Sequence, residues 1–137
     1  MDAAAGEFCW LDLAATDSQA AQAFYGPLFG WKPVEQAAGG GHFTRLQLHG
    51  RDVASLYQLR SLHLSQGMPS HWTPYVRVQD VEGAAGKAAE LGGTVVIPPV
   101  TIGTVARVAA VLDPVGAIVG LWEHFGEHHG QEIVARP

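Results

Sequence analysis

The stretch that decides the fold is FCWLDLAATDSQAAQAFYGPLFGWKPV, residues 8–34, because its pattern returns as TPYVRVQDVEGAAGKAAELGGTVVIPP at residues 73–99. Each copy has an alternating strand, an acidic helix start, an alanine-rich helix and a glycine stop. Asp17 matches Asp80, and Gly30 matches Gly93, each 63 residues further on. A repeat of this length indicates a building block that is used twice.

More strands follow each copy. FTRLQLHGRDVASLYQL (43–59) predicts a hairpin, and RVAAVLDPVGAIVGLWE (107–123) predicts another. Thr16, with Gln19 three residues later, is typical of a helix N-cap and capping box. Leu91 completes the apolar stripe of the second helix, and Pro98-Pro99 is expected to end the strand that begins at residue 94.

These patterns give the order β-α-β-β-β, twice, in a single domain over residues 1–137. Module one covers 7–60, a connection without clear periodicity covers 61–71, module two covers 72–123, and a polar tail covers 124–137.

Composition excludes several classes of protein. Hydrophobic residues make up 47% of the 137 residues and charged residues 15%. A chain of this composition is too apolar to be intrinsically disordered. The net charge of −5 and only eight scattered basic residues argue against a nucleic-acid partner. The single cysteine, Cys9, the lack of a signal-peptide pattern and the lack of a membrane-length apolar run lead us to expect a cytoplasmic protein with no membrane partner.

The repeated elements resemble the vicinal oxygen chelate superfamily, which includes glyoxalases, bleomycin-resistance proteins and extradiol dioxygenases. The motifs that carry the resemblance are Thr16-Asp17, Phe24-Tyr25, Leu28–Trp31, Arg77–Val81, Leu91–Thr94 and Asp113–Ala117. The resemblance implies an α+β fold in which two tandem βαβββ modules form a curved, half-open mixed sheet around a central cavity. It also implies a homodimer.

Metal-dependent members of that superfamily resemble one another in holding a divalent ion at four strand positions. Aligned by module, those positions hold Trp10, Ser55, Thr73 and Gly120 in this chain. An indole donates only, glycine has no side chain, and neutral hydroxyls are poor ligands for first-row metals. We therefore expect no metal and no cofactor at these positions.

Strand alternation instead predicts a pocket wall. Trp10 and Asp12 share a face of their strand, as do Thr73, Tyr75 and Arg77. The other expected ligand-binding residues are Ser55, Tyr57, Gly120 and Trp122, and Gly120 is expected to leave room where relatives carry a metal ligand. The alternatives are a core tryptophan at Trp10 and an ion pair between Asp12 and Arg77 that satisfies only itself.

The histidines suggest little chemistry. His71 should share a face with Thr73, just outside the strand. His124, His128 and His129 lie in the tail, where we expect a solvated segment that binds metal only adventitiously.

Three hypotheses for function remain open. The first is a metal-free protein that binds a small, partly aromatic molecule in the inter-module cavity. The second is a lyase, isomerase or dioxygenase of the vicinal oxygen chelate type with an atypical site, using Asp12 or a tyrosine as base. The third is a dimerising module without a ligand.

Overall fold

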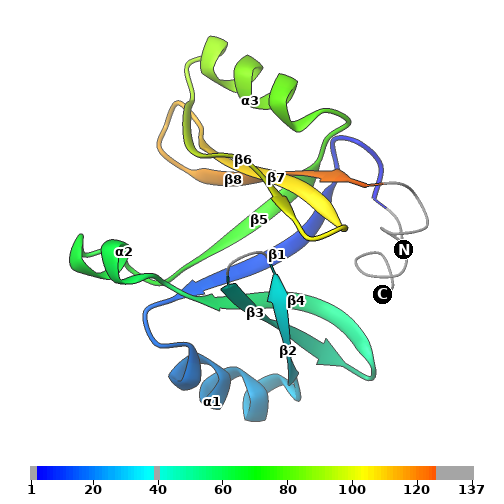
Figure 1. The fold of residues 1–137 in the computed structure, drawn as a ribbon, viewed down its shortest axis with the longest axis vertical. Coiled ribbons are helices and arrows are strands. Elements are labelled where there is room, and N and C mark those ends of the chain that lie inside the picture. The colour runs from blue at the N-terminus through cyan, green and yellow to red at the C-terminus, as the bar shows by residue number, and fades with distance from the viewer. Residues whose placement is uncertain (1–2, 39–40, 126–137) are drawn as a thin grey trace. The chain divides into compact units, whose positions relative to one another are not determined.

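The computed structural model describes residues 3–38 and 41–125, which form two compact units. Residues 11–73 form one, called here the N-terminal unit. Residues 3–10 with 74–125 form the other, called the C-terminal unit. Figure 1 labels the helices and strands of both.

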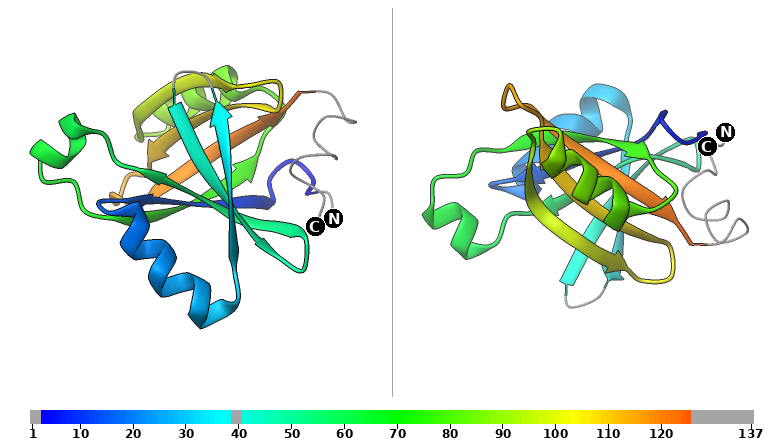
Figure 2. Two further views of the ribbon diagram at one scale, coloured as in Figure 1. Left: turned by 60° about the horizontal axis from the view of Figure 1, so that its bottom comes forward. Right: turned by 90° about the horizontal axis from the view of Figure 1, so that it is seen from above.

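The N-terminal unit is a four-stranded mixed sheet with a helix against one face. Its strands follow the order β2-β3-β4-β1, in which β1 and β4 run parallel and the other pairs antiparallel. The helix α1 packs on this sheet (Figure 2). The elements are β1 (Phe8–Ala15, whose first three residues belong to the other unit), α1 (Ser18–Phe29), β2 (Lys32–Ala38), β3 (Gly41–Leu48), β4 (Arg51–Gln58) and α2 (Ser61–Ser65).

The C-terminal unit repeats this plan. Its strands follow the order β5-β8-β7-β6, with β5 and β8 parallel, and α3 contacts β6, β7 and β8 (Figure 2). The elements are β5 (His71–Arg77, whose first three residues belong to the N-terminal unit), α3 (Val81–Glu90), β6 (Thr94–Ile102), β7 (Ala106–Leu112) and β8 (Ile118–His124).

Each unit has a core between its helix and its sheet. In the N-terminal unit the core contains Leu13, Ala15, Leu46, Ala54 and Leu56; in the C-terminal unit it contains Val81, Ala85, Ala109, Val111 and Leu121.

The two modules share their backbone register as well as their topology. Asp12 pairs with Ser55 across β1 and β4, and Tyr75 pairs with Gly120 across β5 and β8. These pairs are related by the offsets of the sequence repeat. The α+β fold class with two βαβββ modules is therefore confirmed, while the central cavity stays a prediction.

The predicted N-cap of α1 is wrong by one residue. Asp17 is the N-cap, and its carboxylate accepts a hydrogen bond from the Ala20 N–H at 3.0 Å. The Thr16 hydroxyl lies 3.2 Å from the Ser70 hydroxyl instead. Gly30 ends the helix in the left-handed conformation, with φ of 78°, which favours glycine.

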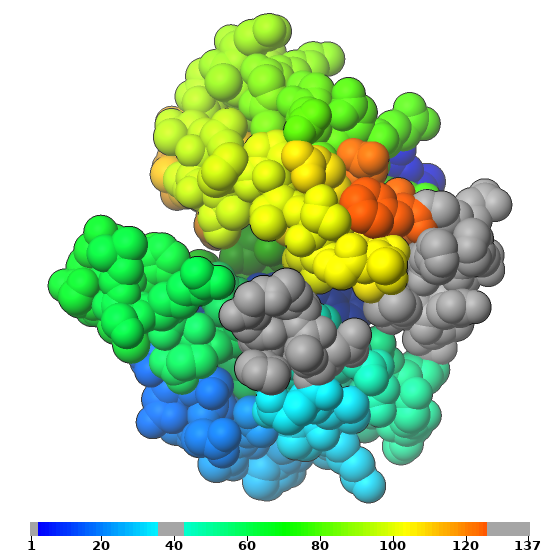
Figure 3. Space-filling model, viewed as in Figure 1, coloured from blue at the N-terminus to red at the C-terminus, as the bar shows by residue number. Residues whose placement is uncertain are grey.

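The expectation of a strand end at Pro98-Pro99 is also wrong. β6 continues to Ile102, although its register with β7 shifts between Val95 and Val100. Within its unit, β6 pairs only with β7. An edge strand tolerates proline because no strand pairs with its outer side, so the N–H that proline lacks is not needed there. Val96, Ile97 and Val100 are exposed along β6, which lies at the surface in Figure 3.

Two smaller differences concern the helices. The segment expected to be an irregular connection contains α2, which stands out from the surface in Figure 3 with Leu62 exposed. Leu91 is 69% exposed and takes no part in the core, because α3 ends at Glu90. In the part of the chain that the structure describes, no helix is long and apolar enough to cross a membrane.

Candidate functional site

The Asp12 carboxyl group is the central feature of the N-terminal unit. The Ser55 hydroxyl donates a hydrogen bond of 2.6 Å to Asp12 Oδ1. Asp12 is half-buried and Ser55 is buried. Burial raises the pKa of Asp12 from 3.8 to about 6, against the smaller lowering effects of the Ser55 hydrogen bond and the His71 charge. Desolvation disfavours the ionised carboxylate, so this group changes protonation state near neutral pH.

Tyr57 and His71 lie within electrostatic reach of Asp12. Burial raises the pKa of the half-buried Tyr57 phenol, and the Asp12 charge raises it further. His71 Nδ1 lies 3.0 Å from the Pro69 carbonyl oxygen, which can only accept, so Nδ1 carries the proton in this bond. Thr73 is buried at the start of β5. The site thus has a carboxyl group whose charge acts on the Tyr57 phenol, and an imidazole whose charge acts on that carboxyl group.

Arg45 is a residue that sequence reasoning missed. It pairs with Ser55 across β3 and β4, so Val34, Arg45, Ser55 and Asp12 form one row across four strands. Residues in such a row share a face of the sheet. The charge of Arg45 therefore belongs to the same face as the Asp12 carboxyl.

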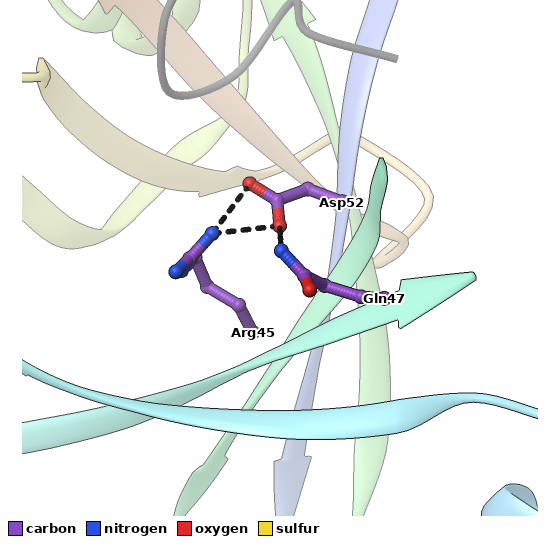
Figure 4. Close-up of polar contacts among 3 residues, drawn as sticks. All are labelled: Arg45, Gln47 and Asp52. Carbon is purple, nitrogen blue, oxygen red and sulfur yellow. Dashed lines mark hydrogen bonds and ion pairs between the residues drawn. The ribbon is translucent and has the colours of Figure 1, made fainter. Parts of the chain in front are cut away.

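The Arg45 side chain is fixed by a nearly buried acid. Its Nη1 donates to both oxygens of Asp52, at 2.9 and 3.1 Å, and Gln47 Nε2 donates to Asp52 Oδ1 at 2.8 Å (Figure 4). The side chain of Asp52 is 5% exposed and that of Arg45 is 25% exposed. Arg45 Nε is buried and has no hydrogen-bond partner among the described residues. A buried donor without a partner costs about 1–3 kcal/mol, and more when charged.

The C-terminal unit holds a cluster of three aromatic rings from the predicted set. The rings of Trp10 and Trp122 are 6.1 Å apart, and Tyr75 meets Trp122 edge-on at 5.8 Å. Trp122 is buried among Val105, Ala106 and Val108. These spacings lie in the range of favourable aromatic pairs.

The space beside Gly120 is filled, contrary to the expectation that it would be open. A Cβ built on Gly120 would lie 2.2 Å from the Tyr75 ring. Because Tyr75 and Gly120 are paired across β5 and β8, the ring covers the glycine directly. Glycine is required here by the tyrosine.

Arg77 is tied to the start of the chain. Its Nη1 donates to the Ala3 carbonyl at 2.7 Å, and its backbone N–H donates to the Glu7 carbonyl at 2.9 Å. Its charge partly offsets the effect of burial on Cys9, whose pKa burial raises to about 11. Cys9 is therefore a neutral thiol at physiological pH and a weak nucleophile.

The expected site residues thus fall into two groups. Asp12, Ser55, Tyr57 and Thr73 belong to the N-terminal unit, and Trp10, Tyr75, Arg77, Gly120 and Trp122 belong to the C-terminal unit. Trp10 and Asp12 are two residues apart on the single strand β1. Side chains two apart on a strand lie on the same side.

The residues at the four superfamily metal positions do not fit a metal ion. Ser55 donates its hydroxyl to Asp12, and the space beside Gly120 is filled by Tyr75. Within residues 3–38 and 41–125, no three His, Cys, Asp or Glu side chains come together in a way that could hold a metal. His124 belongs to β8, where its Nδ1 lies 3.4 Å from Trp122 Nε1, while His128 and His129 lie outside the described residues.

Comparison with protein families identifies the fold. Residues 8–121 match the profile of the glyoxalase/bleomycin resistance protein/dioxygenase superfamily. The chain belongs to this superfamily. The match covers both modules, so the family resemblance seen in the repeated motifs is confirmed.

Two curated relatives illustrate the membership. The chain is 38% identical over 129 residues to "Putative glyoxylase CFP32" of Mycobacterium bovis, which covers 91% of this chain and 48% of the relative. It is 30% identical over 145 residues to "Anthracycline biosynthesis protein DnrV" of Streptomyces peucetius, covering 98% of this chain and 52% of the relative. The chain spans about half the length of the curated relatives it matches.

Solved structures share the fold at low sequence identity. A hypothetical protein, BH1468, from Bacillus halodurans C-125 superposes with a TM-score of 0.64 at 14% identity, covering 90% of this chain and 98% of the other. Methylmalonyl-CoA epimerase from Mycobacterium tuberculosis superposes with a TM-score of 0.58 at 17% identity, covering 90% and 93%. These likenesses concern the fold alone.

Proposed function

We propose that the chain binds a small, partly aromatic molecule along β1 without a metal ion. The observation that carries the proposal is the Asp12–Ser55 pair, a desolvated carboxyl held by a buried hydroxyl, with Trp10 two residues away on the same side of the strand. Apolar surface with a few converging polar groups suits a small organic ligand. The indole offers a face for ring stacking, and Asp12 offers a hydrogen-bond partner that can donate or accept.

The residues at the superfamily metal positions support the metal-free form of this proposal. The Ser55 hydroxyl is neutral and donates its proton to Asp12, and neutral hydroxyls are weak ligands for first-row metals. The ligand would then be recognised by hydrogen bonds and ring contacts. The name of DnrV adds a further hint, because anthracyclines contain planar fused rings.

A thermal-shift screen of chelator-treated protein against small aromatic compounds tests the proposal. A compound that binds only the folded state must raise the melting temperature. For each compound that does so, Trp10→Ala should weaken binding at least tenfold. The matched control is Trp31→Ala, which removes an indole that stacks on Tyr25 at 5.7 Å in the helix-side core. Equal effects of the two substitutions, on variants shown to be folded, would remove β1 from the binding site.

Catalysis by Asp12 is a second candidate function. A carboxyl with a pKa of about 6 is suited to accept a proton at neutral pH, as a lyase or isomerase requires. Turnover that disappears in Asp12→Asn, while the same compound still binds, would favour catalysis over binding alone.

We also propose that two copies of the chain associate through α1. None of the twelve residues of α1 is buried, and Phe24, Leu28 and Phe29 are 59%, 56% and 50% exposed. The helix contains no Asp, Glu, Lys or Arg, although the chain carries a net charge of −5. A neutral apolar face lets two identical acidic chains meet without opposing charges, as a two-fold dimer requires.

A further inference from the structure

The Arg45 guanidinium has one side engaged and one side without a partner. Nη1 donates to both oxygens of Asp52, and Gln47 donates to Oδ1 of the same carboxylate (Figure 4). This arrangement fixes the direction of the guanidinium plane. On the other side, Nε is buried and has no acceptor within the described residues. Buried N–H groups in native proteins nearly always have a protein, water or ion partner, so an acceptor is missing here.

The chemistry of the guanidinium specifies that acceptor. Arginine carries five donors in a rigid plane and no acceptor. With Nη1 used by Asp52, the Nε and Nη2 edge remains, and that edge matches the two oxygens of a carboxylate. A lysine at this position would lack both the plane and the paired donors.

The position of Arg45 relates it to the proposed ligand site. Arg45 pairs with Ser55, and Ser55 pairs with Asp12, so two strand spacings separate the backbones of Arg45 and Asp12. Neighbouring strands are about 4.8 Å apart, which puts these backbones about 10 Å apart. A small molecule held at one end by Arg45 can therefore reach the Asp12–Ser55 pair with a polar group at its other end.

We propose that Arg45 binds the carboxylate of a small organic acid whose polar far end meets Asp12 and Ser55. This inference rests on the proposed function, because it names the chemical class of the ligand at the same site. Asp52 and Gln47 act as positioning residues that hold the guanidinium in place. Arg45 thereby becomes the arginine of the site, whereas Arg77, which was expected on the pocket wall, donates to the Ala3 carbonyl.

Calorimetry with a matched pair of probes tests the inference. The probes are 4-hydroxybenzoate and 4-hydroxybenzamide, which share their ring and hydroxyl and differ in charge. Chelator-treated wild type should bind the acid at least tenfold more tightly than the amide. Arg45→Met should abolish that preference and leave amide binding within about twofold.

Arg45→Lys keeps a charge beside Asp52 and guards against misfolding. It should retain the fold but lose most of the preference for the acid. Arg107→Met is the matched control, since it removes a different ion pair, between Arg107 and Glu82, and should bind both probes as wild type does. In NMR spectra of the wild type, the Arg45 Nε–H signal should shift when 4-hydroxybenzoate is added and stay in place with the amide.

The outcomes separate the inference from the proposed function. If both probes bind wild type equally, or Arg45→Met weakens both equally, the role of Arg45 is overturned and metal-free binding stands. If the acid binds without moving the Nε–H signal, Arg45 is again excluded. If neither probe binds, the inference is overturned, and the aromatic screen decides the proposed function separately.

Discussion

Ser55 donates a hydrogen bond of 2.6 Å to Asp12 from the position that pairs with it across two parallel strands. The equivalent pair in the second module is Gly120 and Tyr75, where an aromatic ring covers the glycine. The two modules therefore share a backbone register and carry different chemistry at it. One has a polar pair that can change protonation state, and the other has a closed aromatic contact.

The first prediction concerns the ionisation of Asp12. Burial raises its pKa to about 6, while the Ser55 hydrogen bond lowers it. In a carboxyl ¹³C NMR titration, the Asp12 signal should have a midpoint near pH 6. Ser55→Ala should move that midpoint higher, because the bond that favours the ionised form is lost. A wild-type midpoint near 4 would show that Asp12 is well solvated.

The second prediction concerns stability and pH. Between pH 3.8 and about 6 the folded state binds more protons at Asp12 than the unfolded state, so this residue makes the protein less stable as pH rises through that window. Asp12→Asn does not titrate. The difference in free energy of unfolding between Asp12→Asn and wild type should therefore move in favour of the variant by up to about 3 kcal/mol from pH 4 to pH 8. This follows from about 1.4 kcal/mol for each pH unit by which burial raises the pKa of Asp12.

Asp52→Asn provides the contrast in the same denaturation experiments. It weakens the acceptor of Arg45 and Gln47, so it should destabilise the protein at pH 8 by about 1–3 kcal/mol. If Asp12→Asn, compared with wild type, is no more stable at pH 8 than at pH 4, the predicted sign for Asp12 is wrong.

The third prediction concerns Gly120. Adding a methyl group should force the Tyr75 ring to move, so Gly120→Ala should lower the free energy of unfolding by about 1–3 kcal/mol. Tyr75→Ala should suppress this loss in the double variant. Gly86→Ala is the control, since nothing lies within 4 Å of the added Cβ in α3, and it should be stabilising by up to about 1 kcal/mol. Additive effects of Gly120→Ala and Tyr75→Ala would mean that the two residues do not compete for space.

The fourth prediction concerns assembly. Light scattering at micromolar concentration should give twice the chain mass of 14.5 kDa for wild type. Replacing Phe24 and Phe29 together by serine should give monomers, because their exposed rings lie on α1. Leu91→Ser changes an even more exposed apolar side chain in the other unit and should leave the dimer intact. A monomeric wild type would refute the α1 interface.

The repeat in the sequence was sufficient to predict the order of strands and helices, because strand alternation and helix periodicity are local properties. Neighbouring residues in the sequence do not reveal whether a strand lies at the edge of its sheet. Pro98-Pro99 was therefore interpreted as a strand end, although β6 has a single partner strand and tolerates both prolines. The five residues of α2 were missed because so short a helix carries hardly any periodic signal.

Arg45 was missed for a register reason. A hairpin closed by His49 and Gly50 and free of irregularities would place Arg45 opposite Ala54, on the helix-side face. The structure has a register shift between Leu46 and Gln47, which places Arg45 opposite Ser55. A shift of one residue changes the face to which a side chain points, and the sequence contains no sign of this bulge.

The filling of the space beside Gly120 could not be predicted either. Alternation placed Tyr75 on the expected face, but the direction of its ring depends on packing against Trp122. A glycine indicates open space only when no neighbouring side chain fills that space. Here Tyr75, which pairs with Gly120 across β5 and β8, fills it.

We propose that this superfamily member binds its ligand without a metal ion. Calorimetry on chelator-treated protein tests it most directly, using the strongest compound from the aromatic screen, with and without one equivalent of Mn²⁺, Ni²⁺ or Zn²⁺. We expect the Kd to stay within twofold whether or not metal is present, and Asp12→Ala to weaken binding at least tenfold. Binding that appears only after metal is added, and that survives Asp12→Ala, would contradict it.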